Sequence, residues 1–196
     1  YPGSVDENWE KEVELVRRSA MEDGAVAIGE IGLDYHYSKE SAGLQKAALK
    51  AQLELAAELD LPVNIHLREA ENDFFEVLES CRHLGLSGNL HAFSGSVETF
   101  RRIEKYGDWY VGIGGVLTFK NARVAESLKS IPLDRIVLET DSPYLTPVPY
   151  RGRRNESSYI PVIAAAVAGI KGTSVDEVAG VTTENAEKLF KIKRQP

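Results

Sequence analysis

Four short apolar runs in this chain of 196 residues each end at a residue whose side chain can bind a metal ion. The runs are AVAIGE, LPVNIH, LSGNLH and RIVLETD, and they close on Glu30, His66, His91 and Asp141. Short apolar runs of this kind are typical of buried parallel strands. In a barrel of parallel strands, the carboxyl ends of the strands point into one mouth, where active sites form. The set therefore predicts a divalent-metal site with nitrogen and oxygen ligands, which neither histidine by itself would indicate.

Strand patterns alternate with helix patterns along the whole chain. We expect strands over 25–29, 62–66, the run that ends at 91, 109–113 and 135–139. We expect the C-terminal helices over 160–170, 175–180 and 184–192, with a capping box from Ser174 to Glu177. The stretch 142–154 is rich in proline and should be irregular. Regular alternation predicts a parallel α/β sheet with right-handed crossovers.

Two architectures fit five parallel strands. An open doubly wound sheet would be complete, whereas an eight-stranded barrel of the TIM type would lack three strands. The sequence contains no GxGxxG or phosphate-loop motif to support a nucleotide-binding open sheet. The glycine-rich segment 112–115 lacks the lysine and the spacing of a phosphate loop. It indicates instead a place where the backbone passes close to another group.

Composition places the chain among ordinary globular domains, and we expect residues 1–196 to form one domain. The net charge of −7 argues against a protein that coats nucleic acid, but it does not exclude an enzyme with a local positive pocket. The single cysteine, Cys81, cannot form an internal disulfide and fits a reducing compartment. No run is long or apolar enough to span a membrane. We expect a cytoplasmic location, or a nuclear one in a eukaryote.

Six phrases in order along the chain resemble the TatD family of metal-dependent deoxyribonucleases. They are GEIGLDYH from Gly29, LPVNIHLREA from Leu61, HAFSG from His91, ETDSPYLTP from Glu139, RGRRNE from Arg151 and TTENAEKLF from Thr182. The resemblance implies a TIM-type parallel (β/α)8 barrel whose site is similar to that of the wider amidohydrolase group. It also implies cleavage of phosphodiester bonds in DNA, commonly from the 3′ end.

The resemblance assigns roles to the four strand-end residues. Glu30 should be the carboxylate shared between metals, and His66 and His91 should bind one metal. Asp141 should bind a metal and help to orient the attacking water. We expect Mg²⁺ or Mn²⁺ to be the working ion, with Zn²⁺ as an option, and two ions in the complete site.

The chain departs from the family pattern at its start. The family carries a His-x-His pair on its first strand, and no such pair stands upstream of Glu30 here. About five of the eight strands and four of the ligands are therefore expected in these 196 residues. We interpret the difference as truncation or missing residues. The form with the pair should be active, and the chain as printed should be a weak or inactive enzyme; a non-catalytic remnant is the alternative.

Several residues could hold the substrate. Strand alternation places Arg68 on the same face as His66, where it could bind a phosphate or pair with Glu69 or Asp34. Arg151, Arg153 and Asn155 belong to the main basic loop and favour phosphate contact. Tyr144 could stack on a base or pack internally. Glu139 could orient a metal ligand or belong to a buried ion pair.

The leading hypothesis is a divalent-metal phosphodiesterase that degrades DNA from single-stranded or frayed 3′ ends. Hydrolysis of a small amide or lactone is the second enzymatic alternative. The basic loop and the family phrases favour phosphate. The preference for DNA over RNA and the oligomeric state stay open.

Overall fold

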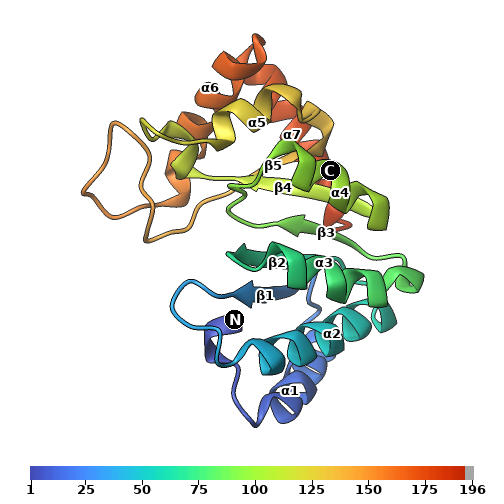
Figure 1. Cartoon of the computed structure of the whole chain (residues 1–196). Helices are drawn as coiled ribbons and strands as arrows, with labels where there is room; N and C mark the ends of the chain where they lie inside the picture. The colour runs from blue at the N-terminus through green and yellow to red at the C-terminus, as the bar shows by residue number, and fades with distance from the viewer. Residues whose placement is uncertain (193–196) are drawn as a thin grey trace. The chain divides into compact units, whose positions relative to one another are not determined.

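The computed structural model describes residues 1–192, and two compact units make up the chain. The first unit contains Tyr1–Leu90 and Lys105–Trp109, and the second contains His91–Glu104 and Tyr110–Pro196. Strands alternate with helices along the chain, as Figure 1 shows from the blue N-terminus to the red C-terminal helices. The five strands are parallel to their neighbours within each unit, which makes the chain an α/β protein.

Three parallel strands in the order β1–β2–β3 form the centre of the first unit. They span Ile28–Asp34, Val63–Arg68 and Ser87–Leu90, and the helices α1, α2 and α3 span Trp9–Glu22, Ala42–Glu58 and Glu71–Ser80. Short 3-10 turns cover Pro2–Ser4 and Arg82–Leu84. Strong helix formers such as alanine, leucine, lysine and glutamate fill α2. Its apolar side is buried with the strands, in a core that includes Leu33, Leu49, Leu53, Ile65 and Phe74.

The second unit contains most of β4 (Asp108–Ile113) together with β5 (Ile136–Leu138). Its helices are α4 (Val97–Ile103), α5 (Val124–Ser130), α6 (Ile160–Lys171) and α7 (Val175–Leu189), and short 3-10 turns lie at Glu104–Tyr106, Gly115–Thr118, Leu133–Arg135 and Ser157–Tyr159. The register pairs Val111 with Ile136 and Gly112 with Val137. Tyr110, Val137 and Leu189 form a small buried cluster. This cluster packs α7 against the sheet of this unit.

The first two strands extend further than the apolar runs predicted. β1 continues to Asp34 and β2 to Arg68, so Glu30 and His66 lie within their strands and not at the ends. The reason is that the ladder uses backbone groups, and it continues through polar side chains as long as these find partners. The amide of Tyr35 still donates to the carbonyl of Arg68 at 3.0 Å.

The C-terminal helix α7 also differs from the prediction, because it runs through Gly180 without a break. Its buried face continues on both sides of this glycine, at Val178, Thr182 and Leu189. An interior glycine costs about 1 kcal/mol, less than this burial contributes. The predicted cap is confirmed, since the hydroxyl of Ser174 accepts from the amide of Glu177 at 3.1 Å.

The stretch 142–154 contains no helix or strand, as expected. Within residues 1–192, no single helix has the length and apolar character to cross a membrane. Only Ser157–Lys171 and Val175–Leu189 would reach that length together, and these two segments are bent by 108°.

Candidate metal centre

In the first unit, His66 lies between two carboxylates that both come from β1. Its Nδ1 is 2.9 Å from Oε1 of Glu30, and its Nε2 is 3.0 Å from Oδ2 of Asp34. The register explains the arrangement, because His66 is directly opposite Gly32, midway between the two acids. A Cβ at Gly32 would lie 1.9 Å from the carbonyl oxygen of His66, so only glycine allows this approach.

Asp34 is the anchored member of this cluster. Its side chain is 6% exposed, and it also accepts from the amide of His36 at 2.9 Å and from the hydroxyl of Tyr1 at 3.2 Å. Burial by itself would raise the pKa of Asp34, but the bonds from His36 and His66 outweigh it, and the pKa lies below its usual value. A fixed, ionised Asp34 is suited to hold Nε2–H of His66, which leaves Nδ1 facing Glu30.

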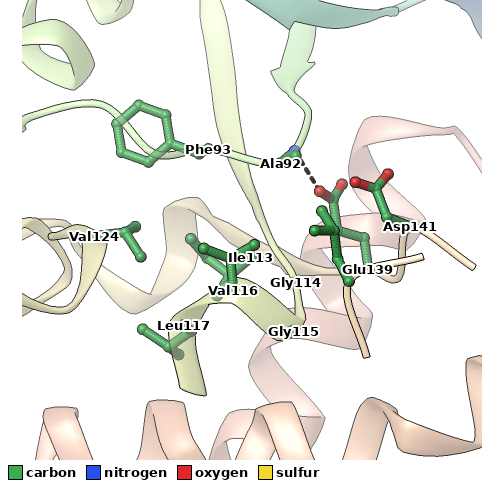
Figure 2. Close-up of a pocket in the computed structure, with 11 residues that line it drawn as sticks. Ala92, Phe93, Ile113, Gly114, Gly115, Val116, Leu117, Val124, Glu139 and Asp141 are labelled. Carbon is green, nitrogen blue, oxygen red and sulfur yellow. Dashed lines mark hydrogen bonds between the residues drawn. The ribbon is translucent and has the colours of Figure 1, made fainter. Parts of the chain in front are cut away.

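In the second unit, His91 follows β3 and also lies between two carboxylates. Its Nδ1 is 3.0 Å from Oε2 of Glu139, and its Nε2 is 2.8 Å from Oδ1 of Asp141. The other oxygen of Glu139 accepts from the amide of Ala92, the contact that is dashed in Figure 2. Burial lowers the pKa of His91, but the bonds and charges of Asp141 and Glu139 outweigh this and raise it to about 10. The ring is therefore protonated at neutral pH in the absence of a metal.

The donors in both clusters are of the types that bind divalent ions. Within residues 1–192, no three or more His, Cys, Asp or Glu side chains surround a common point. Instead, each ring nitrogen of His66 and His91 faces one carboxylate at hydrogen-bond distance. Two ligands about 2.0–2.2 Å from one ion, at a right angle, are about 2.8–3.1 Å apart. The 2.8 Å between His91 and Asp141 and the 2.9 Å between His66 and Glu30 fall within this range, so each pair could bind one ion.

For two residues in these clusters, Asp34 and Glu139, the sequence does not single out one partner or role. The sequence suggests Asp34 as a possible partner of Arg68, whereas in the structure Asp34 pairs with His66. The sequence feature that could have identified Asp34 is its spacing of four residues from Glu30. This spacing places both acids on one face of a strand that extends through both positions. Glu139 is expected either to orient a metal ligand or to belong to a buried ion pair. Its Oε2 lies 3.0 Å from Nδ1 of His91, and the orienting role stays a prediction.

The residues proposed for substrate contact lie in different surroundings, and their phosphate or base contacts stay predictions. Arg68 is exposed and lies over the ring of Tyr37, with its Cζ 5.8 Å from the ring centre. The ion pairs found for Asp34 and Glu69 in the described chain are with His66 and His36, not with Arg68.

The basic loop is engaged in contacts within the second unit, some of them inside the loop itself. Arg151 lies 4.1 Å above the ring of Phe119 and donates to the carbonyl of Thr146. Arg153 lies over Tyr150 at 5.9 Å. Asn155 is 1% exposed and its amide donates to the carbonyl of Tyr144, so its side chain supports the loop. Tyr144 is 73% exposed, which leaves its ring available to a base.

A pocket adjoins the carboxylates of the second unit (Figure 2). Its cavity volume is about 10 Å³, room for about one water molecule. Glu139 and Asp141 supply its polar side, and the apolar side comes from Phe93, Ile113, Leu117, Val124 and Leu145. The carboxylates that face His91 therefore border an apolar wall.

Comparison with known proteins gives consistent results. Residues 1–191 match the family described as TatD related DNase. An uncharacterized metal-dependent hydrolase from Bacillus subtilis, YabD, is 40% identical over 193 residues, which are 98% of this chain and 75% of that protein. A protein from Pantoea ananatis named 3′-5′ ssDNA/RNA exonuclease TatD is 39% identical over 189 residues, which cover 93% of this chain and 72% of the relative.

The crystal structure of the TatD homologue YjjV from Escherichia coli superimposes with a TM-score of 0.89 at 26% identity. The match covers 98% of this chain and 75% of that structure. It confirms the fold class expected from the sequence, an α/β fold of the TIM-barrel type of which this chain carries five parallel strands.

Proposed function

Because this chain belongs to the family of TatD-related DNases, we propose that it is a divalent-metal-dependent phosphodiesterase that degrades DNA from single-stranded or frayed 3′ ends. The observation that carries the proposal is the pairing of each expected histidine with an expected carboxylate, His66 with Glu30 and His91 with Asp141. The Pantoea relative that is named a 3′-5′ exonuclease supports the direction of cleavage.

The residues of both clusters divide into ligands and orienting groups. Glu30, His66, His91 and Asp141 would hold the ions, two in the complete site, with Mg²⁺ or Mn²⁺ favoured and Zn²⁺ as an option. A divalent ion bound there supplies an acidified water and neutralises charge on the phosphoryl oxygens.

Each ligand histidine has a second carboxylate that fixes its ring. Asp34 holds His66 and Glu139 holds His91, each at 3.0 Å. This contact orients the ring and selects the nitrogen that faces the ion. Asp141 is 31% exposed, so it can also reach an attacking water and accept its proton.

Each unit has exposed groups that could contact a nucleic-acid substrate. The ring of Tyr144 offers a flat surface for a terminal base, and the guanidinium of Arg68 can pair with a phosphate. Arg151 and Arg153 could add positive charge near the same loop while their planes rest on aromatic rings.

A cleavage assay of the full-length protein on single-stranded DNA tests the proposal. We expect a 5′-labelled strand to shorten step by step with Mg²⁺ or Mn²⁺, and excess chelator to abolish this until the ion is restored. A 3′-labelled strand should release labelled mononucleotide first. Equal cleavage in excess chelator would refute the metal mechanism, and loss of nucleotides from the 5′ end would refute the direction. Activity on a lactone or an amide without any on DNA would favour the small-molecule alternative.

A further inference from the structure

We propose that Gly112 on β4 is a positioning residue of the metal centre, because its missing side chain leaves the space in which the Glu139 carboxylate holds His91. The inference deepens the proposed function and rests on it for the metal-binding role of His91. Gly112 has no side chain with which to contact a substrate or an ion. Gly112 acts only through Glu139.

The first support is the distance from Gly112 to the Glu139 carboxylate. A Cβ built on Gly112 would lie 2.1 Å from Oε2 and 2.5 Å from Cδ of Glu139. Oε2 is the atom that lies 3.0 Å from Nδ1 of His91. To reach ordinary contact with a methyl group, this oxygen would have to move by about 1 Å or more. Such a shift can take it beyond hydrogen-bond distance from the ring.

The second support is that the backbone on both sides of this contact is tied down. The carbonyl of Gly112 accepts from the amide of Phe93 at 2.9 Å, and the amide of Glu139 donates to the carbonyl of Ile113 at 3.1 Å. Gly112 is also paired with Val137 in the ladder between β4 and β5. The strands therefore cannot separate easily, and the side chain of Glu139 would have to give way.

The third support is what the Glu139 carboxylate does for the segment that carries His91. Its second oxygen accepts from the amide of Ala92, whose φ of 45° lies in the left-handed region. A non-glycine residue adopts this conformation at an energetic cost, which a fixed hydrogen-bond acceptor offsets. One carboxylate thus holds both the ring of His91 and the backbone that follows it. Displacing it would loosen both.

The test compares four variants of the complete natural chain: Gly112→Ala, Gly114→Ala, Glu139→Ala and the double variant of Gly112 and Glu139. Gly114→Ala is the matched control, because a Cβ there would lie 3.6 Å from the carbonyl oxygen of Glu139, in ordinary contact. Two readouts are needed: Mn²⁺ affinity by calorimetry, and the hydrogen-bonded Nδ1 proton of His91 by NMR in the metal-free protein. Replacing His91 removes its resonance from the spectrum and so assigns it.

We expect Gly112→Ala to lower Mn²⁺ affinity about 10–100-fold, the usual effect of losing an orienting partner, and to weaken or shift the His91 resonance. Gly114→Ala should change neither. In the Glu139→Ala background the substitution at Gly112 should add almost nothing, because the carboxylate that it displaces is already gone. A purely structural role for Gly112 would give the same loss in both backgrounds.

Several outcomes would overturn the inference. One is that Gly112→Ala, like Gly114→Ala, changes neither Mn²⁺ affinity nor the His91 resonance. Another is that Gly112→Ala lowers Mn²⁺ affinity by the same factor with and without Glu139→Ala. If Gly112→Ala does not fold, the double variant must regain the fold, and a double variant that stays unfolded refutes the proposal. If the wild-type protein binds no Mn²⁺ and cleaves no DNA, the proposed function fails. The NMR resonance still decides whether Gly112 positions His91 through Glu139.

Discussion

Replacement of Asp34 by alanine should lower the free energy of unfolding of the first unit by about 3 kcal/mol. The carboxylate accepts from the amide of His36 at 2.9 Å and from His66 at 3.0 Å, and its side chain is 6% exposed. A hydrogen bond to a charged group contributes about 1.5–3 kcal/mol, so two such bonds at the lower limit give this value. The bond from Tyr1 is longer, at 3.2 Å, and we count it as zero.

Urea unfolding followed by tryptophan fluorescence measures this effect. Both tryptophans of the sequence, Trp9 and Trp109, belong to the first unit, so the signal reports on the unit that contains Asp34. Glu22→Ala is the control, because Glu22 is an exposed carboxylate at the end of α1 and its loss should change stability by less than about 0.5 kcal/mol. A loss below 1 kcal/mol for Asp34→Ala would refute the role of Asp34 as a buried anchor.

The stability difference between the wild type and Asp34→Ala should depend on pH. The pKa of Asp34 is lowered in the folded state by the bonds from His36 and His66, which outweigh burial. Its ionised form therefore adds stability that is present above the unfolded pKa of about 3.9 and is lost as the pH falls through the lower folded pKa. The stability difference between wild type and Asp34→Ala should be largest near neutral pH and shrink below about pH 4. A difference that stays constant down to pH 2 would contradict this linkage.

Three further predictions concern the metal centre and the substrate. Asp141→Asn should lower turnover about 10²–10⁴-fold with little change in DNA binding. The control variant Asp134→Asn, at an exposed position, should have no effect. Wild-type turnover in Asp141→Asn would exclude a role of Asp141 in activating water. Mn²⁺ affinity should rise with pH up to about 10, because the ion must displace the proton of His91. Calorimetry across pH 6–9 measures this, and an affinity that stays constant with pH would contradict it. Tyr144→Ala should weaken binding of single-stranded DNA by about 1–3 kcal/mol in an anisotropy titration, and unchanged affinity would exclude stacking.

Local patterns in the sequence were sufficient to predict a parallel α/β arrangement, whereas the barrel type came from the resemblance to a known family. Apolar runs and helical periodicity predicted five parallel strands with intervening helices, and the structure has them. The irregular stretch 142–154 and the cap at Ser174 were also predicted, because turn residues and capping spacing act over a few residues. The predicted ends of the strands were less accurate than their predicted existence. β1 continues through Glu30 to Asp34, since backbone pairing with β2 does not depend on an apolar side chain.

The types of the candidate ligands were visible in the sequence, but their contacts were not. His66 contacts Glu30 and Asp34, which are 36 and 32 residues away in the sequence. His91 contacts Asp141, which is 50 residues away. Such contacts depend on the register between strands, which the side-chain pattern of one strand does not contain. The glycine-rich segment around Gly112 predicted a close approach, but only the folded chain shows that the approaching group is the Glu139 carboxylate. The sequence determined which residues could do the chemistry, and the packing of distant segments decided which atoms meet.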